Sequence, residues 1–203
     1  MGAGACGGGY RKPSSPKEEK MCVMIYKEAG GKIPNKDILE RCWNANPHGA
    51  GIAVVTRGGV FFTKGLMTFE AFLKKLKELE ESFDLTEHKT LIHFRYGTSG
   101  GIRPEMTHPF PVEGNDIDSM EGWAKVILAH NGVIRGLGTP EESDTYRVAK
   151  FIRRLRKRKL SYDDIAKILE LNNGRFILLS NRWTKLTGNW IKRYGYYFSN
   201  NKF

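Results

Sequence analysis

A short apolar run that follows a polar leader constrains the fold most strongly. Residues 22–26 read Cys-Val-Met-Ile-Tyr and are followed closely by Gly30-Gly31, a pattern typical of a buried strand. Residues 1–21 are rich in Gly, Ser, Pro and Lys and contain almost no large apolar side chains, so burial cannot offset the entropy of ordering them. We therefore predict a flexible basic leader over 1–21, which would be a propeptide, a tag or a docking arm, and one folded domain over 22–203.

Length and cysteine content narrow the class of protein. A chain of 203 residues fits one ordinary domain with its own core. Its three cysteines are an odd number without a Cys-x-x-Cys pair, which signals neither a disulfide framework nor a zinc site. No apolar stretch approaches the roughly 20 residues that cross a bilayer, and the N-terminus lacks the apolar core of a signal peptide. We expect a soluble cytoplasmic protein with no membrane contact, metal or cofactor.

The net charge of +11 is concentrated in two places, the leader and residues 153–159. Such runs form either a solvated face or a patch for an anionic partner, such as a nucleic acid, another anionic surface or a protein assembly.

Apolar periodicity predicts both helices and strands. Thr68 precedes an amphipathic helix whose apolar residues, from Phe69 to Phe83, share one face. Asn35 and Ser161 are expected helix caps, the latter with Asp164 in a capping box, and another helix is expected to start at Asp144. The expected strands are 22–26, 51–55, 60–63, 91–96, 125–130, 176–180 and 190–198. This mixture, with strands at both ends of the domain, predicts an α+β fold.

Several short polar segments carry candidate functional groups, and two of them lie at the ends of the expected strands 91–96 and 125–130, where a rigid scaffold commonly presents such groups. In chain order they are Met21-Cys22, His93-Phe94-Arg95-Tyr96-Gly97-Thr98, His108-Pro109, His130-Asn131-Gly132 and Ser143-Asp144-Thr145. A cysteine can attack a carboxamide carbon when a nearby group accepts the thiol proton. None of the five histidines lies in a setting that marks it as this base, and His93 and His130 are expected to be core histidines with satisfied hydrogen bonds. A free α-amine on the cysteine itself, with a pKa of roughly 7.7 to 8.0, would serve instead.

These segments resemble the class II glutamine amidotransferases, which are N-terminal-nucleophile hydrolases. That family has Met-Cys-Gly-Ile, an Asp-Ser-Ala-Gly-Ile-Ala-like segment, His-x-Arg-Tyr/Trp-x-Thr, His-Pro, His-Asn-Gly-x-Ile and Ser-Asp-Thr. The corresponding segments here include His48-Gly49-Ala50-Gly51-Ile52-Ala53 and run in the same order from Met21 to Thr145. Each segment alone is weak, and the collinear set is specific.

The resemblance implies a four-layer α-β-β-α sandwich with two mainly antiparallel sheets, and hydrolysis of free L-glutamine through a thioester on Cys22. It assigns the glutamine α-carboxylate to Arg95 and the α-ammonium to Asp144, and the oxyanion to the side-chain amide of Asn131 and the backbone N–H of Gly132. A further group would line the substrate pocket: Tyr96, Thr98 and His108.

Taken singly, each of these residues has an ordinary alternative. Arg95 is typical of an ion-paired arginine, Asn131-Gly132 of a turn, Asp144 of a helix cap and Cys22 of a buried thiol. The chain also departs from the family at Val23, where the family has glycine, and in the leader, which blocks the α-amine of Cys22 while it is attached.

Two readings of function follow. In the first, the protein is a glutaminase once Cys22 is N-terminal, and any ammonia-acceptor enzyme is a separate partner. In the second, it is a catalytically silent structural or docking protein that uses its basic leader and residues 153–159. Small stand-alone domains of this kind resemble those of bacteriophages, which would place the protein in the host cytoplasm or in a phage particle.

Overall fold

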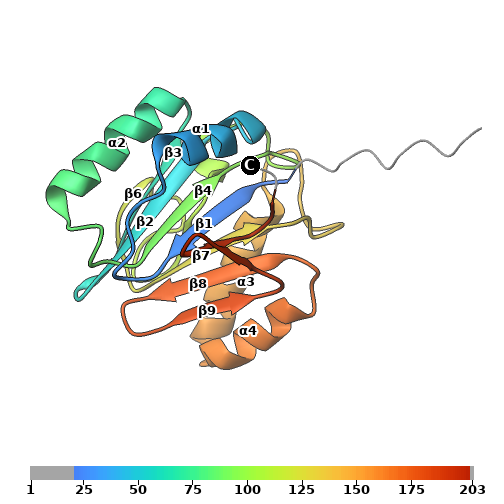
Figure 1. Ribbon diagram of the computed structural model, residues 1–203. Helices are drawn as coiled ribbons and strands as arrows, with labels where there is room; N and C mark the ends of the chain where they lie inside the picture. Colours follow the sequence, from blue (N-terminus) through green and yellow to red (C-terminus); the bar gives the residue numbers. More distant parts are fainter. Residues whose placement is uncertain (1–20, 202–203) are drawn as a thin grey trace, which may run out of the picture.

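The computed structural model describes residues 21–201 (Figure 1). Within this range the chain forms four α-helices and two antiparallel sheets of seven and four strands, which confirms the predicted α+β class. Apart from Met21, the predicted leader lies outside the described residues.

The four helices begin where side-chain caps are available. They are α1 (Lys36–Ala45), α2 (Phe69–Ser82), α3 (Asp144–Lys157) and α4 (Tyr162–Glu170). The residues before them, Asn35, Thr68, Ser143 and Ser161, each accept a hydrogen bond from the backbone N–H three residues later. Such caps each stabilise a helix by roughly 0.5–2 kcal/mol. The apolar face predicted for α2 does lie in the core.

The first strand lies inside the larger sheet. In spatial order this sheet contains β10 (Ile191–Arg193), β11 (Tyr196–Phe198), β1 (Val23–Lys27), β4 (Thr90–Phe94), β2 (Ala50–Thr56), β3 (Gly59–Leu66) and β6 (Glu121–Ala124). The smaller sheet contains β5 (Phe110–Glu113), β7 (Val126–Asn131), β8 (Arg175–Ser180) and β9 (Thr184–Thr187). A short 3-10 helix, η1 (Pro104–Met106), precedes β5. Because β1 pairs with β4 on one side and β11 on the other, distant segments meet at its start.

The structure corrects some strand boundaries. The strand expected over 91–96 ends at Phe94, which leaves Arg95 and Tyr96 outside the ladder. The strand expected over 190–198 is a hairpin, because Tyr194 and Gly195 both adopt positive φ and turn the chain between β10 and β11. Strands β5, β6 and β9 were not predicted; each has only four residues, too few for a periodic pattern.

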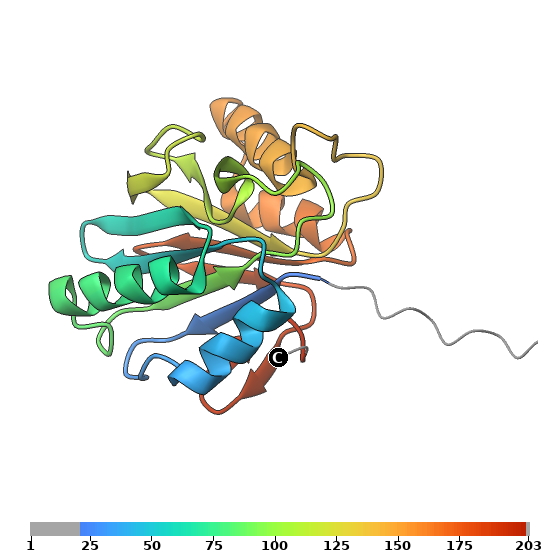
Figure 2. The same ribbon diagram turned by 90° about the horizontal axis from the view of Figure 1, so that it is seen from above.

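Three apolar cores hold these elements together. Helices α1 and α2 pack on the outer face of the larger sheet, and α3 and α4 pack on the outer face of the smaller one. A third core lies between the two sheets. Figure 2 shows both sheets between the two helix pairs. Gly51 marks their close approach, since a Cβ there would overlap the carbonyl oxygen of His108. Across residues 21–201, none of the helices has the length and apolar character that crossing a membrane requires.

Candidate active site

One small cavity gathers most of the predicted site residues. Its volume is about 20 Å³, and its walls include seven of the eight predicted residues: Cys22, Arg95, Tyr96, Thr98, His108, Gly132 and Asp144. Pairing of Val23 with Phe94 places Cys22 opposite Arg95, while Gly132 follows β7 and Asp144 begins α3. The cavity therefore lies where β1, β4, β7 and α3 meet.

Cys22 contributes a protonated thiol. Its Sγ accepts a hydrogen bond from the backbone N–H of Tyr96 at 3.2 Å and lies 3.5 Å from the Tyr96 carbonyl oxygen. Burial raises the pKa of the thiol to about 11, against the lowering effects of the Tyr96 N–H and the Arg95 charge. At neutral pH the thiol needs a base to take its proton before it can act as a nucleophile.

Arg95 places a buried cation in the wall. Its side chain is 2% exposed, and its guanidinium donates to the carbonyl oxygens of Ser99 and Gly101, each at 2.7 Å. Both acceptors are neutral and belong to the loop that follows the arginine. Burial lowers the pKa of Arg95, although a guanidinium keeps its charge in proteins. An anionic group entering the cavity would therefore meet a preformed cation.

Asp144 faces the same cavity with its carboxylate held by backbone groups. Its Oδ2 accepts from the Ile134 N–H at 2.7 Å, and its Oδ1 accepts from the Thr145 N–H at 2.7 Å. A carboxylate offers about four acceptor sites, so capacity remains for an ammonium group. The positively charged Arg95 and the negatively charged Asp144 thus face one cavity. This arrangement suits an amino acid whose α-carboxylate and α-ammonium are both free.

Gly132 presents a backbone that only glycine accommodates easily. Its φ is +149°, and a Cβ would lie 2.8 Å from Nε2 of His130 and 3.0 Å from the Cα of Gly174. Because Gly132 has no side chain, its backbone can line the cavity directly.

Asn131 differs from the other predicted residues because it is not part of the cavity wall. Its side chain is fully buried, its Nδ2 donates to Oγ of Ser199 at 2.8 Å, and its Oδ1 has no hydrogen-bond partner in the described part of the chain. The two ends of an amide are nearly isosteric, and Ser199 can also donate. Turning the amide over would let Ser199 donate to Oδ1 and would release Nδ2 for another acceptor.

Ser199 and Asn200 are structural partners of the site that sequence reasoning missed. Oγ of Ser199 accepts from the Met24 N–H at 2.8 Å, and Nδ2 of Asn200 donates to the Cys22 carbonyl oxygen at 2.7 Å. In sequence, Ser-Asn-Asn is typical of a turn. Only the pairing of β11 with β1 brings these residues to Cys22.

A cluster of buried histidines adjoins the cavity, and two of its members, His108 and His130, line the cavity wall. The rings of His93 and His108 are 4.1 Å apart, and Nδ1 of His108 accepts from the His130 N–H at 3.4 Å. Nδ1 of His130 lies 3.0 Å from Oγ1 of Thr145. Both ring nitrogens of His93 and Nε2 of His130 lack hydrogen-bond partners within residues 21–201, so the prediction of satisfied core histidines is wrong for His93 and only half right for His130. The two sheets enclose these rings without supplying enough polar groups.

Burial leaves these histidines neutral. It lowers the pKa of His93 to about 3 and that of His130 to about 4, and it holds the pKa of His108 well below its ordinary value. Such weak bases are poor acceptors for the proton of a thiol whose pKa is about 11.

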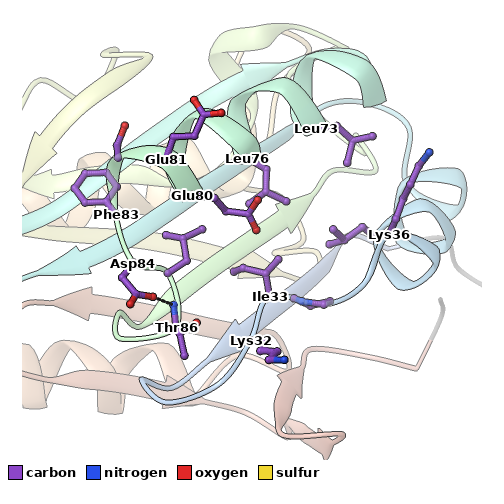
Figure 3. Close-up of a pocket in the computed structure, with 14 residues that line it drawn as sticks. Lys32, Ile33, Lys36, Leu73, Leu76, Glu80, Glu81, Phe83, Asp84 and Thr86 are labelled. Carbon is purple, nitrogen blue, oxygen red and sulfur yellow. Dashed lines mark hydrogen bonds between the residues drawn. The ribbon is translucent and has the colours of Figure 1, made fainter.

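The more spacious hollows lie elsewhere. One of about 760 Å³ lies between α2 and the segments that precede α1 and β4 (Figure 3). Its walls combine apolar side chains such as Leu76 and Ile33 with charges of both signs, including Lys36 and Glu80, and contain neither cysteine nor histidine. Among residues 21–201, no three or more His, Cys, Asp and Glu side chains form a group that could hold a metal ion.

No family model matches this chain, and no curated protein matches it either.

Proposed function

We propose that the protein hydrolyses free L-glutamine to glutamate and ammonia through a thioester on Cys22, provided that Cys22 is the N-terminal residue. The observation that carries this proposal is the single cavity that brings a thiol, a buried guanidinium, a buried carboxylate and a glycine backbone together. These groups come from four separate segments, which the resemblance to class II glutamine amidotransferases had already named.

We also propose that the fold is the four-layer α-β-β-α sandwich of the N-terminal-nucleophile hydrolases. The helix pairs on the outer faces of two sheets, with a core between those sheets, support this assignment. So does the position of β1, a fully buried strand that begins directly after Cys22.

In the proposed reaction the free α-amine of Cys22 accepts the thiol proton, and the thiolate attacks the carboxamide carbon of glutamine. The oxyanion receives hydrogen bonds from the Gly132 N–H and from the Asn131 amide after that amide turns over. The protonated α-amine of Cys22 then gives its proton to the leaving nitrogen of glutamine, and ammonia departs with formation of the thioester. Water, deprotonated by the same amine, attacks the thioester carbonyl and releases glutamate and the thiol.

Recognition of the free amino acid falls to Arg95 and Asp144. A guanidinium offers two parallel donors to the α-carboxylate, and the Asp144 carboxylate accepts from the α-ammonium. A cavity of about 20 Å³ holds about one water, so glutamine enters only when the wall moves. The loop carbonyls of Ser99 and Gly101 bind the guanidinium in the absence of substrate. Opening of this loop would free Arg95 for the carboxylate.

The leader sets a chemical condition on activity. While residue 21 is attached, the nitrogen of Cys22 is a peptide amide without a basic lone pair. The attached form should therefore be inactive, and a cleavage after Met21 should activate it. An enzyme that uses the ammonia would be a separate protein.

The test is glutamate release by protein that begins at Cys22. We expect Cys22→Ala to reduce the rate by at least about 10³-fold, as loss of a nucleophile does in other hydrolases. Cys42→Ala is the matched control, because Cys42 is a fully buried thiol of α1 in the core and should leave the rate unchanged. Equal rates for the Cys22→Ala and parent proteins would exclude the proposal.

A second candidate is a catalytically silent docking protein in a phage particle. The raised pKa of Cys22 and the small volume of the cavity favour it for the form that retains the leader. Intact-mass measurement of the native protein separates the two candidates. A chain that begins at Cys22 supports the enzyme, and a chain that keeps residues 1–21 supports the docking role.

A further inference from the structure

A second polar region lies on the smaller sheet, away from Cys22. It consists of two hollows of about 520 and 290 Å³ whose walls share Glu113 and Arg156, and we call the two together the groove. One end lies between the β2–β3 turn and the β8–β9 turn, which are side by side in Figure 1 and joined by a bond from Asn181 to the Arg57 carbonyl oxygen. The other end follows the last turn of α3.

The groove is strongly cationic. Among the described residues, one carboxylate, that of Glu113, and five basic side chains line it: Lys125, Arg153, Arg156, Lys157 and Arg182. Oε2 of Glu113 is already occupied, since it lies 3.4 Å from Nε of Arg156 and accepts from the Tyr162 hydroxyl at 2.9 Å. Within residues 21–201 only Arg156 of these cations makes an ion pair, and Arg153 is bound to backbone carbonyl oxygens, which leaves Lys125, Lys157 and Arg182. Their charge is available to a ligand.

Residues 153–159 do not form the uniformly solvated face that a charge run suggests. Arg153 donates to the carbonyl oxygens of Pro111 and Asn115, and Arg156 donates to that of Leu160, so both are tied to their surroundings. Cations in the last turn also stabilise α3 through the helix dipole. That effect accounts for Lys157 but not for Lys125, between β6 and β7, or for Arg182 in the β8–β9 turn. Three separate elements therefore direct cations to one groove.

Two aromatic rings stand among these charges. Tyr162 and Trp183 are half-buried, with ring centroids 4.9 Å apart, and both line the larger hollow. Aromatic side chains in a basic groove are the usual means by which proteins hold the bases and the backbone of single strands. The larger hollow falls within the usual size of small-ligand sites, so it can admit one nucleotide, and the smaller one continues along the cations of α3.

We propose that this groove binds single-stranded nucleic acid, with phosphates against Lys125, Lys157 and Arg182 and a base against Trp183. This site is independent of the Cys22 chemistry. Neither the presence nor the absence of nucleic-acid binding bears on the proposed glutaminase activity.

The experiment measures the affinity of the full chain for a fluorescent 12-nucleotide single strand by anisotropy across a salt series. The triple variant Lys125→Ala/Lys157→Ala/Arg182→Ala is compared with Lys74→Ala/Lys77→Ala/Arg158→Ala. The control removes the same charge from exposed lysines of α2 and from an arginine just after α3, none of which lines the groove.

We expect the groove variant to bind at least about tenfold more weakly and the control to stay within about threefold. Each phosphate contact on a single strand contributes about 0.7 to the slope of log affinity against log salt, so the groove variant should lose about 2 from this slope. The Trp183→Leu variant should bind at least about fivefold more weakly, and Trp183→Phe should keep most of the affinity, because stacking needs an aromatic face.

Three results would overturn the proposal. The first is an absence of binding by the parent protein at low salt. The second is an equal loss in both triple variants, which would assign binding to overall charge and the leader. The third is equal affinity for the single strand, for ATP and for vesicles of anionic phospholipid, which would show attraction to any polyanion. Circular dichroism spectra that match the parent keep misfolding from imitating the expected loss.

Discussion

The cavity beside Cys22 and the groove beside Trp183 use polar groups in opposite ways. In the cavity, Arg95 and Asp144 are 2% and 6% exposed and are held by hydrogen bonds to backbone groups. In the groove, Lys125 and Arg182 are exposed and make no ion pair within the described residues. The first arrangement fixes the positions of single atoms, whereas the second supplies charge without fixed geometry. The cavity should therefore be sensitive to shape and insensitive to salt, and the groove the reverse.

The largest difference is expected from a substitution that keeps the charge. Arg95→Lys removes the planar pair of donors, and losing one charge-assisted hydrogen bond of roughly 1.5–3 kcal/mol predicts a 10- to 100-fold lower kcat/KM for glutamine. Arg182→Lys should change nucleic-acid affinity by less than about twofold, since a phosphate needs only the charge. Steady-state kinetics and anisotropy on both variants make the comparison. Similar effects of the two substitutions on the two functions would break it.

Acid should lower the free energy of unfolding through the buried histidines beside the cavity. The folded-state pKa values of His93 and His130, about 3 and about 4, lie below the ordinary 6.5. The unfolded chain therefore binds protons first as the pH falls, so the stability contributed by the neutral rings is complete above pH 6.5 and is lost toward pH 3 to 4. At pH 4.5 the loss in free energy of unfolding is on the order of 2 kcal/mol for each ring.

Urea unfolding at pH 7.5 and pH 4.5 measures this loss, and His93→Leu should reduce the difference between the two values. His88→Gln is the control, because His88 is only half-buried and should leave the difference as in the parent. If His93→Leu leaves the acid loss intact, the buried ring is not its source.

Removal of one buried hydroxyl tests how far the cavity depends on the segment after β11. Ser199→Ala leaves the Met24 N–H and the Asn131 amide without their partner, which should cost roughly 1–3 kcal/mol of stability. It should also lower kcat more than it raises KM, because the Asn131 amide acts on the transition state in the proposed reaction. Thr184→Val, which removes a hydroxyl paired with Tyr26 away from the cavity, should spare kcat. If the kcat of Ser199→Ala equals that of the control, Ser199 does not support catalysis at the cavity.

The smallest effect is expected at the start of α4, beside the groove. Ser161→Ala removes the helix cap next to Tyr162 and should cost about 1 kcal/mol of stability. Nucleic-acid affinity should change by less than about twofold, since the groove does not rely on exact placement. A loss of tenfold or more would show that the groove is as dependent on geometry as the cavity.

Local sequence patterns were sufficient for the helices and for much of the candidate site. The caps at Asn35, Thr68 and Ser161 and the apolar face of α2 are written in neighbouring residues, because helix contacts are made within a few positions. The order of the short motifs likewise identified seven residues that share one cavity. Strands of four residues, such as β5, β6 and β9, carry too little pattern to be recognised.

What the sequence by itself determined is the composition of the cavity wall and the class of fold. Only the tertiary structure decided how those groups are satisfied: that Asn131 bonds to Ser199, that Asn200 holds the carbonyl of Cys22, and that the ring nitrogens of His93 have no hydrogen-bond partner within residues 21–201. It also decided that cations from the β6–β7 connection, α3 and the β8–β9 turn share one groove. The physical reason is the same in each case. These contacts join residues far apart in the chain, and sheet pairing and packing set their distances, which no local pattern records.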